Sequence, residues 1–96
     1  MEISFKSKKL ERICNDFSEA TQRHGKEMAV ILHNRMDQLR GADSVDMMTV
    51  FKIGNCHPLI GDRIGQFALY LRHPYRLIFK PEGLGAVRIL EIVDYH

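Results

Sequence analysis

The spacing of apolar residues changes near the middle of this sequence, and that change limits the folds that the chain can adopt. In the N-terminal half, Leu10, Ile13, Cys14 and Phe17 recur at intervals of three and four, which is the pattern of one helix face. In the C-terminal half, β-branched and aromatic residues gather in short runs between turn residues. A chain of 96 residues has room for one core, so we expect a single α+β domain over residues 1–96.

The N-terminal half predicts a short strand followed by two helices. The segment EISF alternates apolar and polar residues as a strand does, and Ser7 can cap the first helix. That helix should end just before Gly25, which offers a left-handed stop, and the second should end at Gly41 for the same reason. Asp43 or Ser44 can start one further helical turn. The apolar stripe of the second helix consists of Met28, Ile31, Leu32, Met36 and Leu39.

The C-terminal half predicts a meander of three strands over residues 66–72, 75–80 and 87–94. The segments HP and PEGLG supply the two turns between them. The expected element order is therefore β, α, α, β, β, β, with a small and mainly antiparallel sheet packed against a helical hairpin.

The apolar pattern also predicts how the first two strands of the meander pair. An odd-length loop over residues 73–75 would set Leu71 opposite Leu77 and Leu69 opposite Phe79, which gathers apolar residues on the helix side. A two-residue loop would instead bury an arginine without a partner, at a cost of several kcal/mol. The preferred register collects one tyrosine and three cations on the opposite face: Tyr70, Arg72, Arg76 and Lys80.

This predicted basic face has two interpretations. Charged residues on the open side of an antiparallel sheet are usually just solvated. An aromatic ring among cations on a rigid sheet can also hold phosphates while stacking a base, as RNA-binding surfaces do. The net charge of +2 permits such contact without requiring it, because 14 Lys and Arg stand against 12 Asp and Glu.

Several classes of protein are disfavoured by composition. The apolar runs are too short to cross a membrane, and the N-terminus lacks the pattern of a signal peptide, so we expect a cytoplasmic protein. Cys14 and Cys56 show no disulfide or metal spacing and are expected as reduced thiols, and His24 and His33 do not form a ligand pair. No glycine-rich phosphate loop is present. We therefore expect neither a metal nor a small-molecule cofactor.

Two segments carry residues able to move protons. The C-terminus places Asp94, Tyr95 and His96 directly after the last strand, and a histidine oriented by a carboxylate can exchange protons near neutral pH. The segment HPLIGDRIGQF begins with His57 and leads into a strand. The plain alternatives are a frayed terminus in the first case and a histidine bonded to backbone in the second.

The motifs HPLIGDRIGQFALYL, YRLIF and EIVDYH resemble the signature of the HigB branch of the RelE superfamily, the toxins described as plasmid maintenance killer proteins. The motifs cover residues 57–96, and the N-terminal half is matched by element order only. The resemblance implies a RelE-like fold and a ribosome-dependent endoribonuclease that cuts messenger RNA without a metal. It also implies two kinds of partner: a cognate HigA-like antitoxin, and the ribosome with its mRNA.

Residue roles follow from the same resemblance. Arg76 would clamp the scissile phosphate, His96 or Asp94 would exchange protons, Tyr95 would position a base, and His57 would supply a second proton-transfer group. These five are the expected catalytic residues. The expected RNA-binding residues are Arg63, Tyr70, Arg72 and Lys80.

One position departs from the pattern. HigB-type toxins often read HPLKGDR, whereas this chain has Ile60 in place of the lysine. A cation near the phosphate is then missing, and Arg63, Arg72 or Lys80 would have to compensate for it. The departure also leaves open a second hypothesis, a toxin or binding module of the same fold that occupies a target such as gyrase, as ParE-type toxins do.

Overall fold

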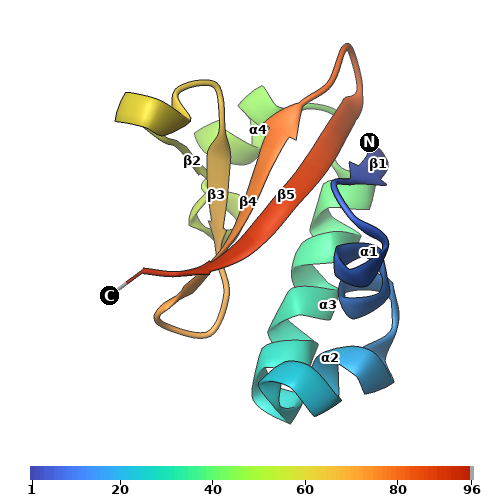
Figure 1. The fold of residues 1–96 in the computed structure, drawn as a ribbon. Coiled ribbons are helices and arrows are strands. Elements are labelled where there is room, and N and C mark those ends of the chain that lie inside the picture. Colours follow the sequence, from blue (N-terminus) through green and yellow to red (C-terminus); the bar gives the residue numbers. More distant parts are fainter. Residues whose placement is uncertain (96) are drawn as a thin grey trace.

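The computed structural model describes residues 1–95 and places five strands in a single sheet. The sheet order is β1-β5-β4-β3-β2, with β1 parallel to β5 and the other neighbours antiparallel (Figure 1). The strands are β1 (Glu2–Phe5), β2 (His57–Pro58), β3 (Phe67–Tyr70), β4 (Tyr75–Pro81) and β5 (Ala86–Asp94). The helices are α1 (Lys8–Asn15), α2 (Phe17–His24), α3 (Lys26–Gly41) and α4 (Val45–Val50), with short 3-10 turns η1 (Ile53–Asn55) and η2 (Gly61–Arg63). The predicted α+β fold with a small, mainly antiparallel sheet is confirmed.

The predicted first helix is wrong in one respect, because the chain forms two helices there. Asp16 takes an extended conformation between α1 and α2, and its carboxylate accepts hydrogen bonds from the backbone N–H groups of Ser18 (2.9 Å) and Glu19 (3.3 Å). An aspartate at this position caps a new helix. Phe17, expected on the buried face, is exposed as a result.

The remaining helix boundaries follow the predicted caps with one exception. Ser7 accepts the N–H of Leu10 at 3.1 Å, and Gly25 adopts a φ of 85° between α2 and α3. Ser44 caps α4 by accepting the N–H of Met47 at 3.0 Å. Gly41 is not a left-handed cap, however: it is the last residue of α3, and the chain leaves the helix through an extended Ala42.

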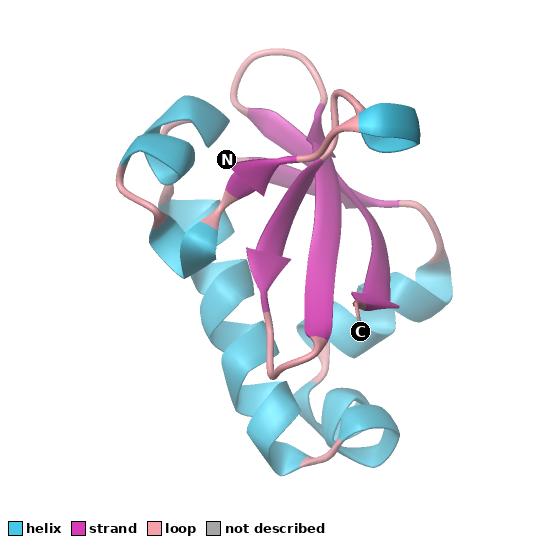
Figure 2. Cartoon of the chain, turned by 90° about the vertical axis from the view of Figure 1, so that its left-hand side faces the viewer, coloured by secondary structure: helices cyan, strands magenta, loops and turns pink. Residues whose placement is uncertain are grey.

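One face of the sheet packs against the helices. Figure 1 shows α1, α2 and α3 on one side of the strands, and Figure 2 shows the strands from a direction in which no long helix crosses them. The fully buried Leu69, Leu77 and Phe79 join Leu32 and Met36 of α3 in the main core. The opposite face, which we call the outer face, is not covered by these helices.

The predicted pairing of β3 with β4 is wrong by two residues. Leu69 pairs with Leu77 and Tyr70 with Arg76, because the turn begins already at Leu71, whose N–H donates to the carbonyl of Tyr75 at 3.1 Å. A shift of two keeps every side chain on its expected face. Tyr70 and Arg76 therefore still share the outer face, whereas Arg72 falls in the turn.

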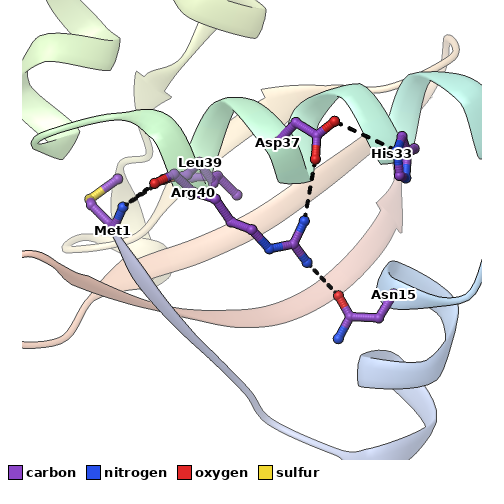
Figure 3. Close-up of polar contacts among 6 residues, drawn as sticks. All are labelled: Met1, Asn15, His33, Asp37, Leu39 and Arg40. Atoms are coloured by element: carbon purple, nitrogen blue, oxygen red, sulfur yellow. Dashed lines mark hydrogen bonds and ion pairs between the residues drawn. The ribbon is translucent and has the colours of Figure 1, made fainter.

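A group of polar contacts fastens the first strand and helix to the end of α3 (Figure 3). The amino group of Met1 donates to the carbonyl oxygens of Leu39 (3.1 Å) and Arg40 (2.6 Å). Arg40 in turn donates to Asn15 at 2.6 Å and lies 3.5 Å from the carboxylate of Asp37. A positive group is favourable beside the unpaired carbonyls at a helix C-terminus.

No helix within residues 1–95 has the length and apolar character needed to cross a membrane.

Candidate functional site on the outer face of the sheet

The outer face has an apolar floor that polar side chains cover. Ala68 and Ile78 pair across β3 and β4, are 0% exposed, and yet lie outside the core that packs on the helices. Since neighbouring residues along a strand point to opposite faces, these two side chains face away from the helices. Their burial must come from larger side chains on the outer face itself. The outer face is therefore an organised surface and not a row of independent solvated charges.

His57 is one of the residues beside this floor. The two-residue strand β2 sets it opposite Ala68, and its ring lies 5.9 Å from the ring of Tyr70 in an edge-on arrangement. Its Nδ1 is 2.7 Å from the carbonyl oxygen of Asn55. A carbonyl only accepts, so Nδ1 carries the hydrogen and the neutral ring keeps its lone pair on Nε2. The contact therefore fixes the tautomer whose Nε2 can take a proton.

Arg76 lies against Tyr70 from the neighbouring strand. The central carbon of its guanidinium is 3.7 Å from the centre of the Tyr70 ring, and its Nη1 donates to the carbonyl of Tyr75 at 2.9 Å. Stacking on an aromatic face holds a guanidinium in place without using its N–H groups. Arg76 can therefore still offer donors to a phosphate. His57, Tyr70 and Arg76 form a continuous group, which we call the outer-face cluster.

Arg63 also reaches the outer face, but it is already paired. Its guanidinium donates to Glu91 of β5 and to Gln66, each at 3.0 Å. Glu91 pairs with Ile78 in the sheet and thus stands beside the floor. Glu91 was not among the residues expected at this site, although alternation along the segment EIVD favours one shared face for Glu91 and Val93. This ion pair reduces the charge that Arg63 can offer to RNA.

The other two expected RNA-binding residues lie away from the outer-face cluster. Arg72 forms an ion pair of 2.5 Å with Glu27 of α3, on the helix side of the sheet. Lys80 is exposed and pairs with Arg88, four residues along β4 from Arg76 and so roughly 13 Å away. Neither Arg72, which lies in the turn, nor Lys80, which lies in β4, contacts the outer-face cluster.

The C-terminal triplet divides between the two faces. Asp94 pairs with Tyr75, whereas Val93 pairs with Arg76, so alternation carries Asp94 toward the helix side. The N–H of Tyr95 donates to the carbonyl of Pro74 at 3.0 Å, which continues the ladder and directs Tyr95 toward the face of Arg76. His96 lies outside the described residues.

Two exposed apolar residues lie on the turn between β2 and β3. Ile60 and Ile64 flank the turn η2 and are 88% and 80% exposed. The turn is tied down at both ends, because the N–H of Leu59 donates to the carbonyl of Gln66 at 2.9 Å. Ile60, which replaces the lysine of the resembled motif, is thus displayed to solvent on a short and anchored turn.

The chemistry of the described residues favours proton transfer and phosphate binding. Within residues 1–95, no three His, Cys, Asp or Glu side chains gather as metal ligands would. Both cysteines are free thiols, and burial raises the pKa of Cys14 to about 12 and that of Cys56 to about 11, so neither is a nucleophile at neutral pH. The residues suited to this chemistry are His57, with an available Nε2, and Arg76, and both contact Tyr70.

Comparison with known proteins finds similar structures but no similar sequence. No family model matches the chain, and no curated protein matches it by sequence. Among solved structures, a YoeB/ParE toxin from Agrobacterium tumefaciens superposes with a TM-score of 0.68 at 15% identity, covering 100% of both chains. YoeB in a YoeB-YefM complex from Staphylococcus aureus gives 0.65 at 18% identity, over 100% of this chain and 97% of that one. The chain has the fold of these toxins along its whole length.

Proposed function

We propose that this protein is the toxin of a type II toxin-antitoxin pair and that it cleaves messenger RNA on the ribosome. Three observations support the proposal: the motif resemblance to HigB, the whole-chain likeness in fold to YoeB toxins, and the outer-face cluster. The cluster carries the most weight, because it joins a proton-transfer group to a phosphate-binding group on an open face. The antitoxin partner is supported by the solved YoeB-YefM toxin-antitoxin complexes.

The proposed reaction needs no group beyond side chains and the RNA itself. The ribose 2'-OH loses its proton to a base and attacks the adjacent phosphorus, the bond from phosphorus to the 5' oxygen breaks, and that oxygen takes up a proton. The products are a 2',3'-cyclic phosphate and a free 5'-OH. DNA cannot react in this way because it lacks the 2'-OH.

We assign the roles as follows, with the outer-face cluster as their main support. Arg76 binds the phosphate oxygens, and its charge stabilises the phosphorane as negative charge develops. His57 moves one proton through Nε2 while Asn55 holds Nδ1. Tyr70 holds the guanidinium of Arg76 in place by stacking against it. The second proton transfer is assigned to Tyr95 or His96, because strand alternation directs Asp94 toward the helix side. Lys80 attracts the RNA backbone from the edge of the outer face, whereas Arg63 is already paired with Glu91.

Expression under a tightly repressed promoter in a bacterial host tests this proposal. We expect the wild type to stop growth within one or two generations and to create new 5' ends within translated messengers, detected by primer extension. The Arg76→Ala variant should do neither, although it accumulates to the same level. Unchanged growth and intact messengers in cells that contain folded wild-type protein would refute the toxin proposal.

The exposed isoleucines favour a second candidate function, a toxin that acts by binding a protein target. Ile60 and Ile64 flank the same short turn and are both largely exposed, and apolar side chains exposed together on one turn can contact a protein target. A pure binder needs no proton transfer, so the double variant with Arg76→Ala and His57→Ala would remain toxic. Replacing both isoleucines with serine would then abolish toxicity instead.

A further inference from the structure

Arg35 of α3 reaches the end of β3 and has no charged partner there. Its Nε donates to the backbone carbonyl of Tyr70 at 2.6 Å, and its Nη1 donates to the side-chain oxygen of Gln38 at 3.2 Å. It forms no ion pair with any carboxylate of residues 1–95. Partial burial lowers the pKa of this guanidinium below its usual value. A charge that is partly withdrawn from water depends on its hydrogen bonds, so the bond to Tyr70 is a principal contact of Arg35.

The carbonyl of Tyr70 points away from β4. The N–H of Leu71 donates to the carbonyl of Tyr75 at 3.1 Å, so these two residues are bonded to each other at the end of the ladder. Along an antiparallel ladder, bonded pairs alternate with pairs that exchange no hydrogen bonds. Tyr70 and Arg76 form the next pair and therefore exchange none. The carbonyl of Tyr70 faces the side of β2, where it needs another donor.

The strand β2 is too short to supply that donor. It pairs through His57 with Ala68, and the same register, if continued, would set Asn55 opposite Tyr70. The strand does not continue there, because η1 interrupts it and Asn55 takes a left-handed φ of 55°. Arg35 supplies the donor that a longer β2 would have given.

Gly54 of η1 lies directly against the Arg35 side chain. A Cβ atom at this position would lie 2.8 Å from Nε and 2.9 Å from Cδ of Arg35, which is closer than non-bonded atoms approach in a packed protein. The φ of 58° at Gly54 also favours glycine. The next residue is Asn55, whose carbonyl oxygen lies 2.7 Å from Nδ1 of His57. Arg35 therefore contacts both the strand that carries Tyr70 and the segment that holds His57.

We propose that Arg35 is a positioning residue for the outer-face cluster, which fixes Tyr70 through its carbonyl and His57 through η1. One side chain from the helix layer thereby sets the 5.9 Å separation of the two rings. Because Tyr70 also stacks on Arg76, the same contact sets where the phosphate-binding group lies. Arg35 itself does not contact the RNA. Its effect on rate rests on the proposed cleavage, whereas its effect on His57 can be measured without RNA.

Nuclear magnetic resonance of the full chain with ¹⁵N-labelled histidine tests the effect on His57, whose signal is assigned with the variant His57→Gln. At a pH where the ring is neutral, we expect the wild type to carry the hydrogen on Nδ1 and to show an unprotonated Nε2. Arg35→Met keeps the length of the side chain but removes its donors, so the shifts of both nitrogens should move toward the average of exchanging tautomers. Arg40→Met is the matched control on the same helix, because Arg40 contacts Asn15 and Asp37 instead, and it should keep the wild-type pattern.

Cleavage of reporter mRNA provides the second measurement. Arg35→Met should lower kcat about tenfold or more with little change in KM, because the reacting groups are displaced while the RNA still binds. Arg35→Lys should restore most of the rate, since its ammonium group can donate to the carbonyl of Tyr70. Thermal melting of each variant checks that it is folded.

Gly54→Ala changes the same contact while it leaves Arg35 in the chain. The added methyl group would push the guanidinium away from the carbonyl of Tyr70, so this variant should shift the same His57 nitrogens. Residues in contact have effects that do not add. The double variant with Gly54→Ala and Arg35→Met should therefore lose no more activity than the more damaging single variant.

Three results would overturn the positioning role of Arg35. They are an unchanged His57 tautomer in folded Arg35→Met, equal changes in Arg40→Met, and additive losses of activity in the double variant. A wild type that shows the expected tautomers but does not cleave mRNA would refute the proposed cleavage and leave the orientation of His57 by Arg35 standing.

Discussion

The two faces of the sheet use the same strands but achieve burial in different ways. On the helix side, Leu69, Leu77 and Phe79 are buried by other apolar side chains. On the outer face, Ala68 and Ile78 are buried to the same degree without joining that core. Low exposure therefore has two meanings in this molecule. It marks structural residues on one face and the floor of a candidate site on the other.

Phe79→Ala tests the helix side and should have the largest effect on stability. Phe79 is fully buried and its ring stacks on that of Phe67, with 5.8 Å between ring centres. Removing a buried aromatic ring costs about 3–5 kcal/mol of unfolding free energy. Urea denaturation followed by circular dichroism measures it. Phe67→Ala, at a partly exposed position, should cost less, and an equal or greater loss there would contradict the assignment of the core.

Arg76→Ala tests the outer face and should remove activity while leaving stability almost intact. Loss of a group that binds the transition state typically lowers the rate by about 10²–10³-fold. Arg72→Ala is the matched control, because Arg72 is an arginine four residues away that pairs with Glu27 instead. Cleavage of reporter mRNA and thermal melting should be measured on both variants. Similar losses of cleavage in both variants would contradict the assignment of activity to the outer face.

Ile60→Lys distinguishes the nuclease from the binding hypothesis by the sign of its effect. The lysine would restore the cation of the resembled motif on the turn before β3, so a nuclease should cleave up to about tenfold faster. A protein that acts through an apolar surface should lose toxicity, because a charge would then enter its interface. Growth inhibition and mRNA cleavage, measured in the same cells, separate these outcomes. No change in either measurement would show that Ile60 serves neither role.

The smallest expected effect is a loss of folding stability at high pH, caused by the buried thiols on the helix side. Burial raises the pKa of Cys14 from 9.0 to about 12, so the unfolded chain releases this proton at lower pH than the folded one. The contribution of Cys14 to the free energy of unfolding is therefore fully present below pH 9 and is lost as the pH rises toward 12. The loss at pH 10 is about 1 kcal/mol. Urea midpoints at pH 8 and pH 10 measure the loss. Cys14→Ala should reduce the difference between them, and an unchanged difference would assign it to other groups.

Much of the fold follows from local sequence signals. The caps Ser7 and Gly25 and the three strand runs lie where their residue types predict them. The break at Asp16 also had a signal, since Glu19 follows three positions later as in a capping box, but the continuous apolar spacing concealed it. The register of β3 and β4 depended on where the turn begins, which only the bond from Leu71 to Tyr75 decides.

The candidate site was predicted in part. The prediction that Tyr70 and Arg76 share a face needed only the alternation of side chains along the strands, so it survived the two-residue error in register, whereas their direct pairing was not predicted. The place of His57 beside Tyr70 depends on β2, whose two residues are too few to show a period. Arg72 was assigned to the outer face because the sequence does not reveal its long-range partner Glu27. The roles assigned to Asp94, Tyr95 and His96 remain predictions.

The most direct test is primer extension on a reporter mRNA in a reconstituted translation system, with and without ribosomes. The wild type, Arg76→Ala and Arg72→Ala should be compared at equal concentrations of folded protein. We predict cuts within codons that require ribosomes, that persist in Arg72→Ala and that disappear in Arg76→Ala. Absence of cuts with the wild type, or their persistence in Arg76→Ala, would contradict the assignment of mRNA cleavage to the outer face.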